Sequence, residues 1–201
     1  MTCGTGFVKS HTGSVSMCPV VNIANTRAAL PETLIVDASL LLVLQSTSRH
    51  THQAVARAFL RRVGNECLSG NMLCLAPTLV LEECYFKIIQ FYIERHRPAG
   101  WTWHRYYKSN PQIIQQCIAH ITAFHQLVTA IPIAIVSPED LALTEPSYPL
   151  EERMRHFISA SNLLPKDAYI LAVAERLGVD GIATLDGDWR RAQQFFTVYT
   201  C

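Results

Sequence analysis

The sequence predicts an α/β fold, a three-layer α/β/α sandwich in which helices cover both faces of a central, mostly parallel sheet of about five strands. Short apolar runs alternate along the chain with longer stretches in which apolar residues recur at helical spacing. Parallel neighbours in a sheet need such crossover connections, and strands that are covered on both faces have continuous apolar runs. The 201 residues, 49% of them hydrophobic, are enough for one well-filled core.

The predicted strands are short apolar runs bounded by polar or turn-forming residues. The first strand, 33–37, ends in Asp37, and Ser39 can then cap a short helix over 40–44. The other strands are expected at 72–76, 131–136, 181–185 and 196–199.

The longer helices are predicted between these strands. Gly64 should end the helix that begins near Thr51, and Pro77 should open a long helix that continues to about Arg95. Pro165 and Gly178 enclose the last helix. Further helices are expected at about 110–130 and 151–160, which leaves long connections at 95–110 and 138–150.

The domain organisation follows from the first thirty residues. Residues 1–30 are rich in Gly, Ser, Thr and Asn and have no sustained period, which predicts a flexible N-terminal tail. The folded domain is then expected over 31–201, with a helical extension around 95–130.

Composition and charge narrow the classes of function. A formal net charge of +1 excludes a surface that is positive all over, so any contact with nucleic acid would come from local patches. The seven cysteines are scattered and include no CxxC pair, which favours reduced thiols over a disulfide framework or a zinc site. No apolar stretch approaches the ~20 residues of a membrane helix, and we see no secretion signal. We therefore expect a soluble, cytoplasmic protein.

Acidic residues follow the predicted strands or begin a predicted helix. Asp37 ends the first strand, and Asp167 lies in the first turn of the helix after Pro165. The others are Glu82 and Glu83 after the second strand, and Asp186 and Asp188 after the fourth. Because the carboxyl ends of parallel strands meet at one edge of a sheet, these acids can share a site.

Such a group of carboxylates would need cations. Held within a few ångströms, the carboxylates would repel one another and raise their pKa values. Oxygen ligands without thiolates favour Mg²⁺ or Mn²⁺ over zinc. A site of this kind suits hydrolysis of phosphodiester bonds, in which a metal ion polarises the phosphate and lowers the pKa of the attacking water.

Each acid also has a structural interpretation. Asp37 could cap a helix, Asp167 would be favoured by the helix dipole, and Asp186-Gly187-Asp188 is an ordinary turn composition. Their co-occurrence beside strand ends favours a shared site over these separate interpretations.

Four stretches of the sequence resemble the PIN-domain ribonucleases, a family that includes the VapC-type toxins. They are 34–39, 77–83, 166–174 and 183–189, in the family's order and at similar spacings. The resemblance extends over about 33–200, and the chain departs from the compact toxins in its tail and its two long connections. It implies a parallel sheet flanked by helices (a PIN-like fold), a divalent-metal site and endonucleolytic cleavage of single-stranded RNA.

The resemblance also implies roles for individual residues. Four acids would bind Mg²⁺ or Mn²⁺ and carry the catalysis: Asp37, Glu83, Asp167 and Asp186. Asp188 would be an auxiliary metal-binding acid, and the hydroxyls of Ser39 and Thr184 would steady the site. The implied partners are RNA, an antitoxin protein and a second copy of the chain, with no membrane.

Helical periodicity and the spacing of the family motif disagree on whether Glu82 or Glu83 belongs to the site. On a helix Glu82 shares its face with Phe86 and Ile89, so periodicity alone would bury Glu82 and expose Glu83. The interval from Pro77 is similar to the family's pattern for Glu83, and we place Glu83 in the site.

Residues 101–108 interleave aromatic and basic side chains, as surfaces that grip single-stranded nucleic acid do. The candidate substrate contacts are Trp103, Arg105, Tyr106 and Lys108. The alternative is that these rings pack a long connection against the core, and the sequence favours neither.

Three functions of different classes fit these observations. The first is a Mg²⁺- or Mn²⁺-dependent endoribonuclease, with the toxin of a toxin–antitoxin pair as one role. The second is a PIN-like module without catalysis that binds RNA or a protein. The third is a phosphohydrolase of the haloacid-dehalogenase type, which needs a second Asp two residues after its nucleophile, where this chain has Ser39.

Overall fold

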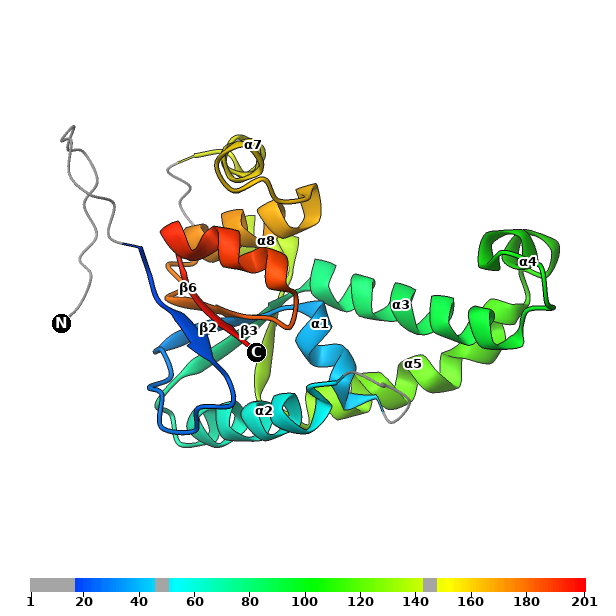
Figure 1. Cartoon of the computed structure of the whole chain (residues 1–201), viewed down its shortest axis with the longest axis horizontal. Coiled ribbons are helices and arrows are strands. Elements are labelled where there is room, and N and C mark those ends of the chain that lie inside the picture. Colours follow the sequence, from blue (N-terminus) through cyan, green and yellow to red (C-terminus); the bar gives the residue numbers. More distant parts are fainter. Residues whose placement is uncertain (1–16, 46–50, 143–147) are drawn as a thin grey trace.

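The computed structural model describes residues 17–45, 51–142 and 148–201, and its centre is a six-stranded parallel sheet (Figure 1). The strand order across the sheet is β1 (Val20–Asn22), β6 (Thr197–Thr200), β5 (Gly181–Ala183), β2 (Thr33–Val36), β3 (Leu73–Pro77) and β4 (Ile133–Val136). Every neighbouring pair is parallel. The predicted α/β class with a parallel sheet is confirmed, with one strand more than expected.

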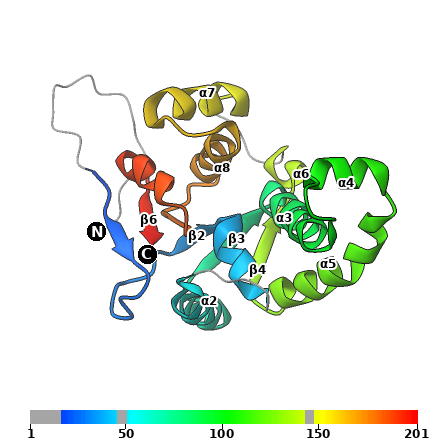
Figure 2. The ribbon, with the colours of Figure 1, turned by 45° about the vertical axis from the view of Figure 1, so that its right-hand side comes forward.

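Helices cover both faces of this sheet. The helices are α1 (Ala38–Leu41), the 3₁₀ helix η1 (Leu42–Leu44), α2 (Gln53–Leu68), α3 (Thr78–His96), α4 (Trp103–Ser109), α5 (Ile113–Thr129), α6 (Pro138–Ala142), α7 (Leu150–Ser161), α8 (Pro165–Arg176) and the 3₁₀ helix η2 (Gly187–Gln194). Figure 2 shows α2 on one side of the sheet and α8, with α7 outside it, on the other. The layers are therefore those of an α/β/α sandwich.

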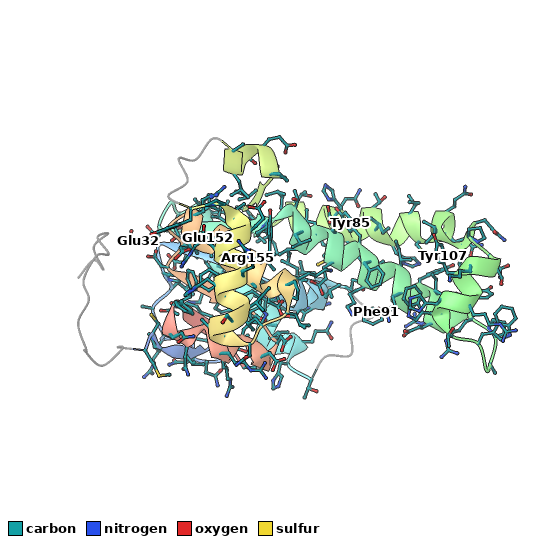
Figure 3. The ribbon with its side chains drawn as sticks, turned by 90° about the horizontal axis from the view of Figure 1, so that it is seen from above. Glu32, Tyr85, Phe91, Tyr107, Glu152 and Arg155 are labelled. Carbon is teal, nitrogen blue, oxygen red and sulfur yellow. The ribbon has the colours of Figure 1, made fainter. Side chains whose placement is uncertain are left out.

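Helices α3 and α5 run side by side away from the sheet, and α4 joins them at their outer end (Figures 1 and 3). We call α3, α4 and α5 together the helical arm. The arm contains the region around 95–130 where a helical extension was expected. It is anchored at the sheet because α3 begins directly after β3.

The centre of the core is β2. Leu34, Ile35 and Val36 have no exposed surface, as expected for a strand that has neighbours on both edges and helices on both faces. On α8, small side chains such as Ala168 and Ala172 are buried, which allows the helix backbone to approach the sheet closely.

The expected tail of residues 1–30 needs one correction. Residues 1–16 lie outside the described residues, but Val20–Asn22 forms the edge strand β1, which pairs with β6. Ile23 is buried, and its N–H donates to the carbonyl of Thr200 at 2.9 Å. Backbone pairing holds this segment in place, although only one of its three strand residues is partly buried. The sequence has no long apolar run here, so this strand was not predicted.

The predicted end of the second helix is wrong. Helix α2 continues through Gly64 to Leu68, and Gly70, with a φ of 72°, follows it in the left-handed conformation. Gly64 is buried inside the helix, where a Cβ atom would lie 3.5 Å from Pro132 and 3.6 Å from Ile131. Here the glycine allows close packing of α2 against the segment before β4 and does not stop the helix.

Both expected connections contain helices. Helix α4 lies within 95–110, and the side chain of its N-cap residue, Thr102, accepts a hydrogen bond from the N–H of Arg105 at 3.2 Å. Helix α6 begins the second connection, of which 143–147 lie outside the described residues. No helix in the described part of the chain is long and apolar enough to cross a membrane.

Gly181 in β5 is expected to be intolerant of a side chain. A Cβ atom there would lie 2.8 Å from Cε2 of Tyr199 and 3.3 Å from Cγ of Pro31. Tyr199 is a buried ring whose hydroxyl donates to the carbonyl of Ala29, so the ring has little room to move. We expect Gly181→Ala to lower the free energy of unfolding by about 1–3 kcal/mol, measured by urea denaturation.

Gly187→Ala is the matched control for Gly181→Ala. No atom lies within 4 Å of a Cβ built at Gly187, so its stability should change by less than about 0.5 kcal/mol. Equal stability of the two variants would contradict the packing argument.

Candidate functional site

The candidate site begins at Asp37, at the carboxyl end of the central strand β2. Asp37 is only 5% exposed and is the N-cap residue of α1. One of its oxygens, Oδ2, accepts three hydrogen bonds: from Ser39 Oγ at 2.6 Å, from Ser39 N at 3.3 Å and from Thr184 Oγ1 at 2.9 Å. Within the described residues Oδ1 has no such bond, which leaves this oxygen for a cation.

Thr184, which follows β5, ties the ends of β5 and β2 together. Its Oγ1 lies 3.1 Å from Ser39 Oγ and accepts a hydrogen bond from Asp186 N at 3.0 Å. The N–H of Leu185 donates to Ser39 Oγ at 2.9 Å. The two hydroxyl groups thus connect Asp37 to the turn that carries Asp186, which is a geometry suited to holding the site rigid.

Asp186 and Asp188 extend the site toward solvent. Asp186 is the N-cap residue of η2, and its Oδ1 accepts a hydrogen bond from Asp188 N at 2.9 Å. Asp188 is exposed and forms an ion pair with Arg191 at 3.0 Å. The turn interpretation of Asp186-Gly187-Asp188 is therefore correct locally, and the same turn carries two carboxylates beside the strand end.

The structure answers the question of burial for Glu82 and Glu83. Glu82 is exposed, whereas the Glu83 side chain is 25% exposed and its Oε2 lies 3.9 Å from Nζ of Lys166. The burial predicted from helical periodicity is wrong because the first turns of α3 pass the carboxyl edge of the sheet, where the half-buried face is the one toward α8. We did not predict Lys166 as a site residue from the sequence, although its position directly before Asp167 could have indicated that it lies near the site.

Asp167, in the first turn of α8, has a pKa that is affected by the other acids of the site. Its pKa is raised from 3.8 to about 7, first by burial and then by the negative charges of Asp37, Asp186, Glu83 and Asp188. Carboxylates from four separate parts of the chain therefore act on one another electrostatically at this edge. In the described part of the chain, no three His, Cys, Asp or Glu side chains lie close enough together to hold a metal ion without moving.

A thiol also lies beside these acids. Cys84 is buried and donates to the carbonyl of Ala38 at 3.7 Å. Burial and then the negative charges of Asp37 and Glu83 raise the pKa of this thiol well above its usual range. Cys84 therefore stays neutral, and the donors that the site offers are carboxylate oxygens.

The aromatic segment 101–108 lies on the helical arm, at the end away from the sheet in Figure 1. Trp103 packs against Phe86 of α3 with ring centroids 5.7 Å apart, and Tyr106 packs against Trp101 at 6.2 Å. The guanidinium of Arg105 lies 4.3 Å from the centroid of the Trp101 ring. These contacts agree with the packing interpretation, while Arg105 and Lys108 remain exposed.

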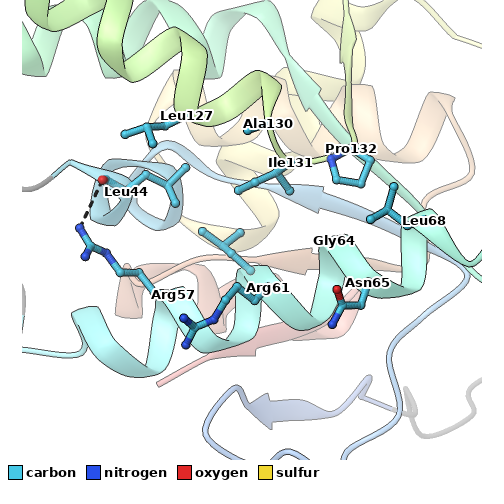
Figure 4. A pocket seen from close by; sticks show the side chains of 11 residues that line it. Leu44, Arg57, Arg61, Gly64, Asn65, Leu68, Leu127, Ala130, Ile131 and Pro132 are labelled. Carbon is cyan, nitrogen blue, oxygen red and sulfur yellow. Dashed lines mark hydrogen bonds between the residues drawn. The ribbon is translucent and has the colours of Figure 1, made fainter.

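A cavity of considerable size lies elsewhere. It measures about 640 Å³ and lies between α2 and the end of α5, lined mainly by apolar side chains with Arg57 and Arg61 on the α2 side (Figure 4). None of the acids discussed above lines it. The acids at the carboxyl edge are thus separate from this cavity.

Comparisons with known proteins find similarity in structure and none in sequence. No protein-family model matches this chain, and no curated protein sequence does. The crystal structure of VapC20 from Mycobacterium tuberculosis, a sarcin–ricin loop cleaving toxin, matches 79% of this chain and 94% of its own length, with 14% identity and a TM-score of 0.46. VapBC2 from Rickettsia felis, bound to a DNA fragment from its promoter, matches 84% and 98%, with 9% identity and a TM-score of 0.43.

Both names are of the VapC type that the four sequence stretches resemble. At these identities and TM-scores the likeness does not support an activity by itself. The residues at the carboxyl edge belong to the stretches of this chain that resemble the PIN-domain ribonucleases of the VapC type.

Proposed function

We propose that this protein is a metal-dependent endoribonuclease that hydrolyses phosphodiester bonds in single-stranded RNA. The observation that carries the proposal is the gathering of acids at the carboxyl edge, where burial and then the negative charges of four other acids raise the pKa of Asp167 to about 7. Such an excess of negative charge is typical of a site built for cations.

The donor set fits Mg²⁺ or Mn²⁺. The available groups are carboxylate oxygens, the only nearby thiol described here stays neutral, and hard divalent ions prefer oxygen ligands. Asp37, Glu83, Asp167 and Asp186 would hold the metal, with Asp188 at the outer side. Asp37 offers Oδ1, because Ser39 and Thr184 occupy Oδ2.

The chain's own residues prepare this chemistry. A bound divalent ion supplies positive charge to the phosphate and lowers the pKa of the attacking water. Ser39 and Thr184 fix the orientation of the Asp37 carboxylate, so that little reorganisation is needed when charge develops. Lys166, whose exposed ammonium group lies 3.9 Å from Glu83 Oε2, would supply positive charge to a phosphate bound beside these acids.

The two other functions have less support. A haloacid-dehalogenase mechanism needs a carboxylate two residues after Asp37, but Ser39 stands there and its hydroxyl donates to Asp37 Oδ2. A module without catalysis would not need the coupled acids at the carboxyl edge. The wider role implied by the resemblance, a cytoplasmic toxin with an antitoxin partner and a homodimeric state, stays a prediction.

Removal of the proposed metal or of its ligands should abolish cleavage. We expect purified protein to cut single-stranded RNA with Mg²⁺ or Mn²⁺ and not in EDTA, followed by gel electrophoresis of a labelled transcript. Asp37→Asn should lower the rate at least about a hundredfold, since charge stabilisation by a metal is worth several kcal/mol. Cleavage by this variant, or in EDTA, at the wild-type rate would refute the proposed mechanism.

Glu82 and Glu83 offer a matched pair of substitutions on one helix. Glu83→Gln should reduce the cleavage rate by about the same factor as Asp37→Asn, because it removes the charge of a proposed metal ligand. Glu82→Gln changes an exposed carboxylate and should leave the rate within about twofold of the wild type. The reverse order would assign the site to Glu82.

The raised pKa of Asp167 predicts how stability depends on pH without metal. The folded chain holds this proton more tightly than the unfolded chain, so the stabilisation is complete below pH 3.8 and is lost as the pH rises through about 7. We expect the Tm in EDTA to fall between pH 5 and 8, and Asp167→Asn to reduce that fall. Mg²⁺ should raise the Tm at pH 8 in the wild type more than in this variant. An unchanged pH profile in Asp167→Asn would contradict the assignment.

A further inference from the structure

A second hollow lies on the helical arm, between α3, α5 and the end of η1. Its volume is about 360 Å³, within the range of small-ligand sites, and its lining combines aromatic, cationic and amide groups. The lining residues are Gln45, Ile88, Phe91, Tyr92, Arg95, His96 and His120. The carboxyl-edge site uses none of them.

The wall of this hollow is ordered by ring contacts. Tyr92 stacks on His96 with ring centroids 4.1 Å apart, and the His120 ring lies 5.2 Å from Tyr92 on the α5 side. The Tyr92 hydroxyl donates to Gln116 Oε1 at 3.2 Å, and His96 Nδ1 lies 2.8 Å from the Tyr92 carbonyl oxygen. An ordered aromatic wall lowers the entropy cost of binding a flat ligand.

Phe91 leaves an apolar ring uncovered at the mouth of this hollow. Its side chain is 52% exposed, and Figure 3 shows it at the edge of the arm. Arg95, one turn further along α3, is also exposed. A free ring beside a guanidinium is the pairing that binds a nucleobase together with its phosphate.

The hollow and the candidate site share one helix, α3. Glu83, Lys87, Phe91 and Arg95 follow one another at intervals of four residues, so each lies beside the next on the helix surface. From Glu83 to Arg95 the helix rises about 18 Å. At ~3.4 Å per stacked nucleotide this length corresponds to at most about five nucleotides.

We propose that the hollow at Phe91, Arg95, His96 and His120 is a subsite for a nucleotide of the RNA strand, bound by stacking of its base on Phe91 and by contact of its phosphate with Arg95. The strand would reach the hollow from the acids past Lys87. This inference rests on the proposed nuclease function for the direction of the strand, while the chemistry of the hollow stands on its own lining.

The test is RNA binding by the full chain in EDTA, where cleavage is absent. A labelled oligouridine of about ten nucleotides, twice the predicted span, is titrated by fluorescence anisotropy. Phe91→Ala should weaken binding roughly 5-fold to 150-fold, the equivalent of about 1–3 kcal/mol for one stacked base. Arg95→Gln should also weaken binding and flatten its dependence on salt.

Phe86→Ala is the matched control, because Phe86 is a 46% exposed phenylalanine on the same helix that contacts Trp103 and does not line the hollow. It should leave the affinity within about twofold. An oligomer of the same length without bases should bind the wild type and Phe91→Ala equally, since only stacking is lost. Equal losses in Phe86→Ala and Phe91→Ala, or a loss that persists without bases, would overturn the subsite.

Cleavage with Mg²⁺ separates this proposal from the proposed function. RNA that is cut normally by Phe91→Ala and bound with unchanged affinity would overturn the subsite and leave the nuclease intact. RNA that is bound through Phe91 but never cut would support the subsite and refute the nuclease.

Discussion

The site depends on one carboxylate oxygen, Asp37 Oδ2, which accepts hydrogen bonds from the hydroxyls of both Ser39 and Thr184. These hydroxyls come from segments that follow two neighbouring strands, β2 and β5. The bonds therefore fix the carboxyl edge of the sheet and the orientation of the acid at the same time. The turn that carries Asp186 is attached to the same hydrogen-bond network through Thr184. Loss of any one of these groups would therefore weaken the hydrogen bonds of the others.

The parallel topology explains why the remaining acids collect at this edge. Each strand of the central part delivers the chain to the same side, where α1, α3 and η2 begin. Asp167 arrives from α8, and burial, followed by the negative charges of the other acids, raises its pKa to about 7. The helical arm adds a second kind of surface, with rings and cations, that continues from Glu83 along α3. The fold thus offers one region suited to cations and another suited to an anionic strand.

The sequence predicted the centre of the molecule better than its periphery. Buried strands such as β2 and β5 have apolar runs that few other structures can satisfy, so their positions were predicted to within about two residues. The edge strand β1 has only three residues and depends on backbone pairing with β6, which no local pattern records. Gly64 was misread because a glycine inside a helix and a glycine that ends one look alike until the neighbour, here Ile131, is known.

The same limitation applies to the site. Periodicity assigned burial on α3 as though the whole helix faced a core, yet its first turns face the other acids, and Glu83 is the more buried of the two glutamates. The resemblance favoured Glu83 because of its interval from Pro77, which helical periodicity does not take into account.

Asp37 and Asp167 differ in what their neutralisation would do to the fold. Asp37 is a helix cap and the acceptor of three hydrogen bonds, so a residue without those oxygens would loosen the edge of the sheet. At Asp167, burial and the neighbouring negative charges oppose the charged carboxylate, so an uncharged residue at this position would remove that repulsion. An uncharged residue at position 167 would therefore remove one carboxylate from the group and leave the hydrogen bonds between Asp37, Ser39 and Thr184 in place, so the edge of the sheet would keep its shape.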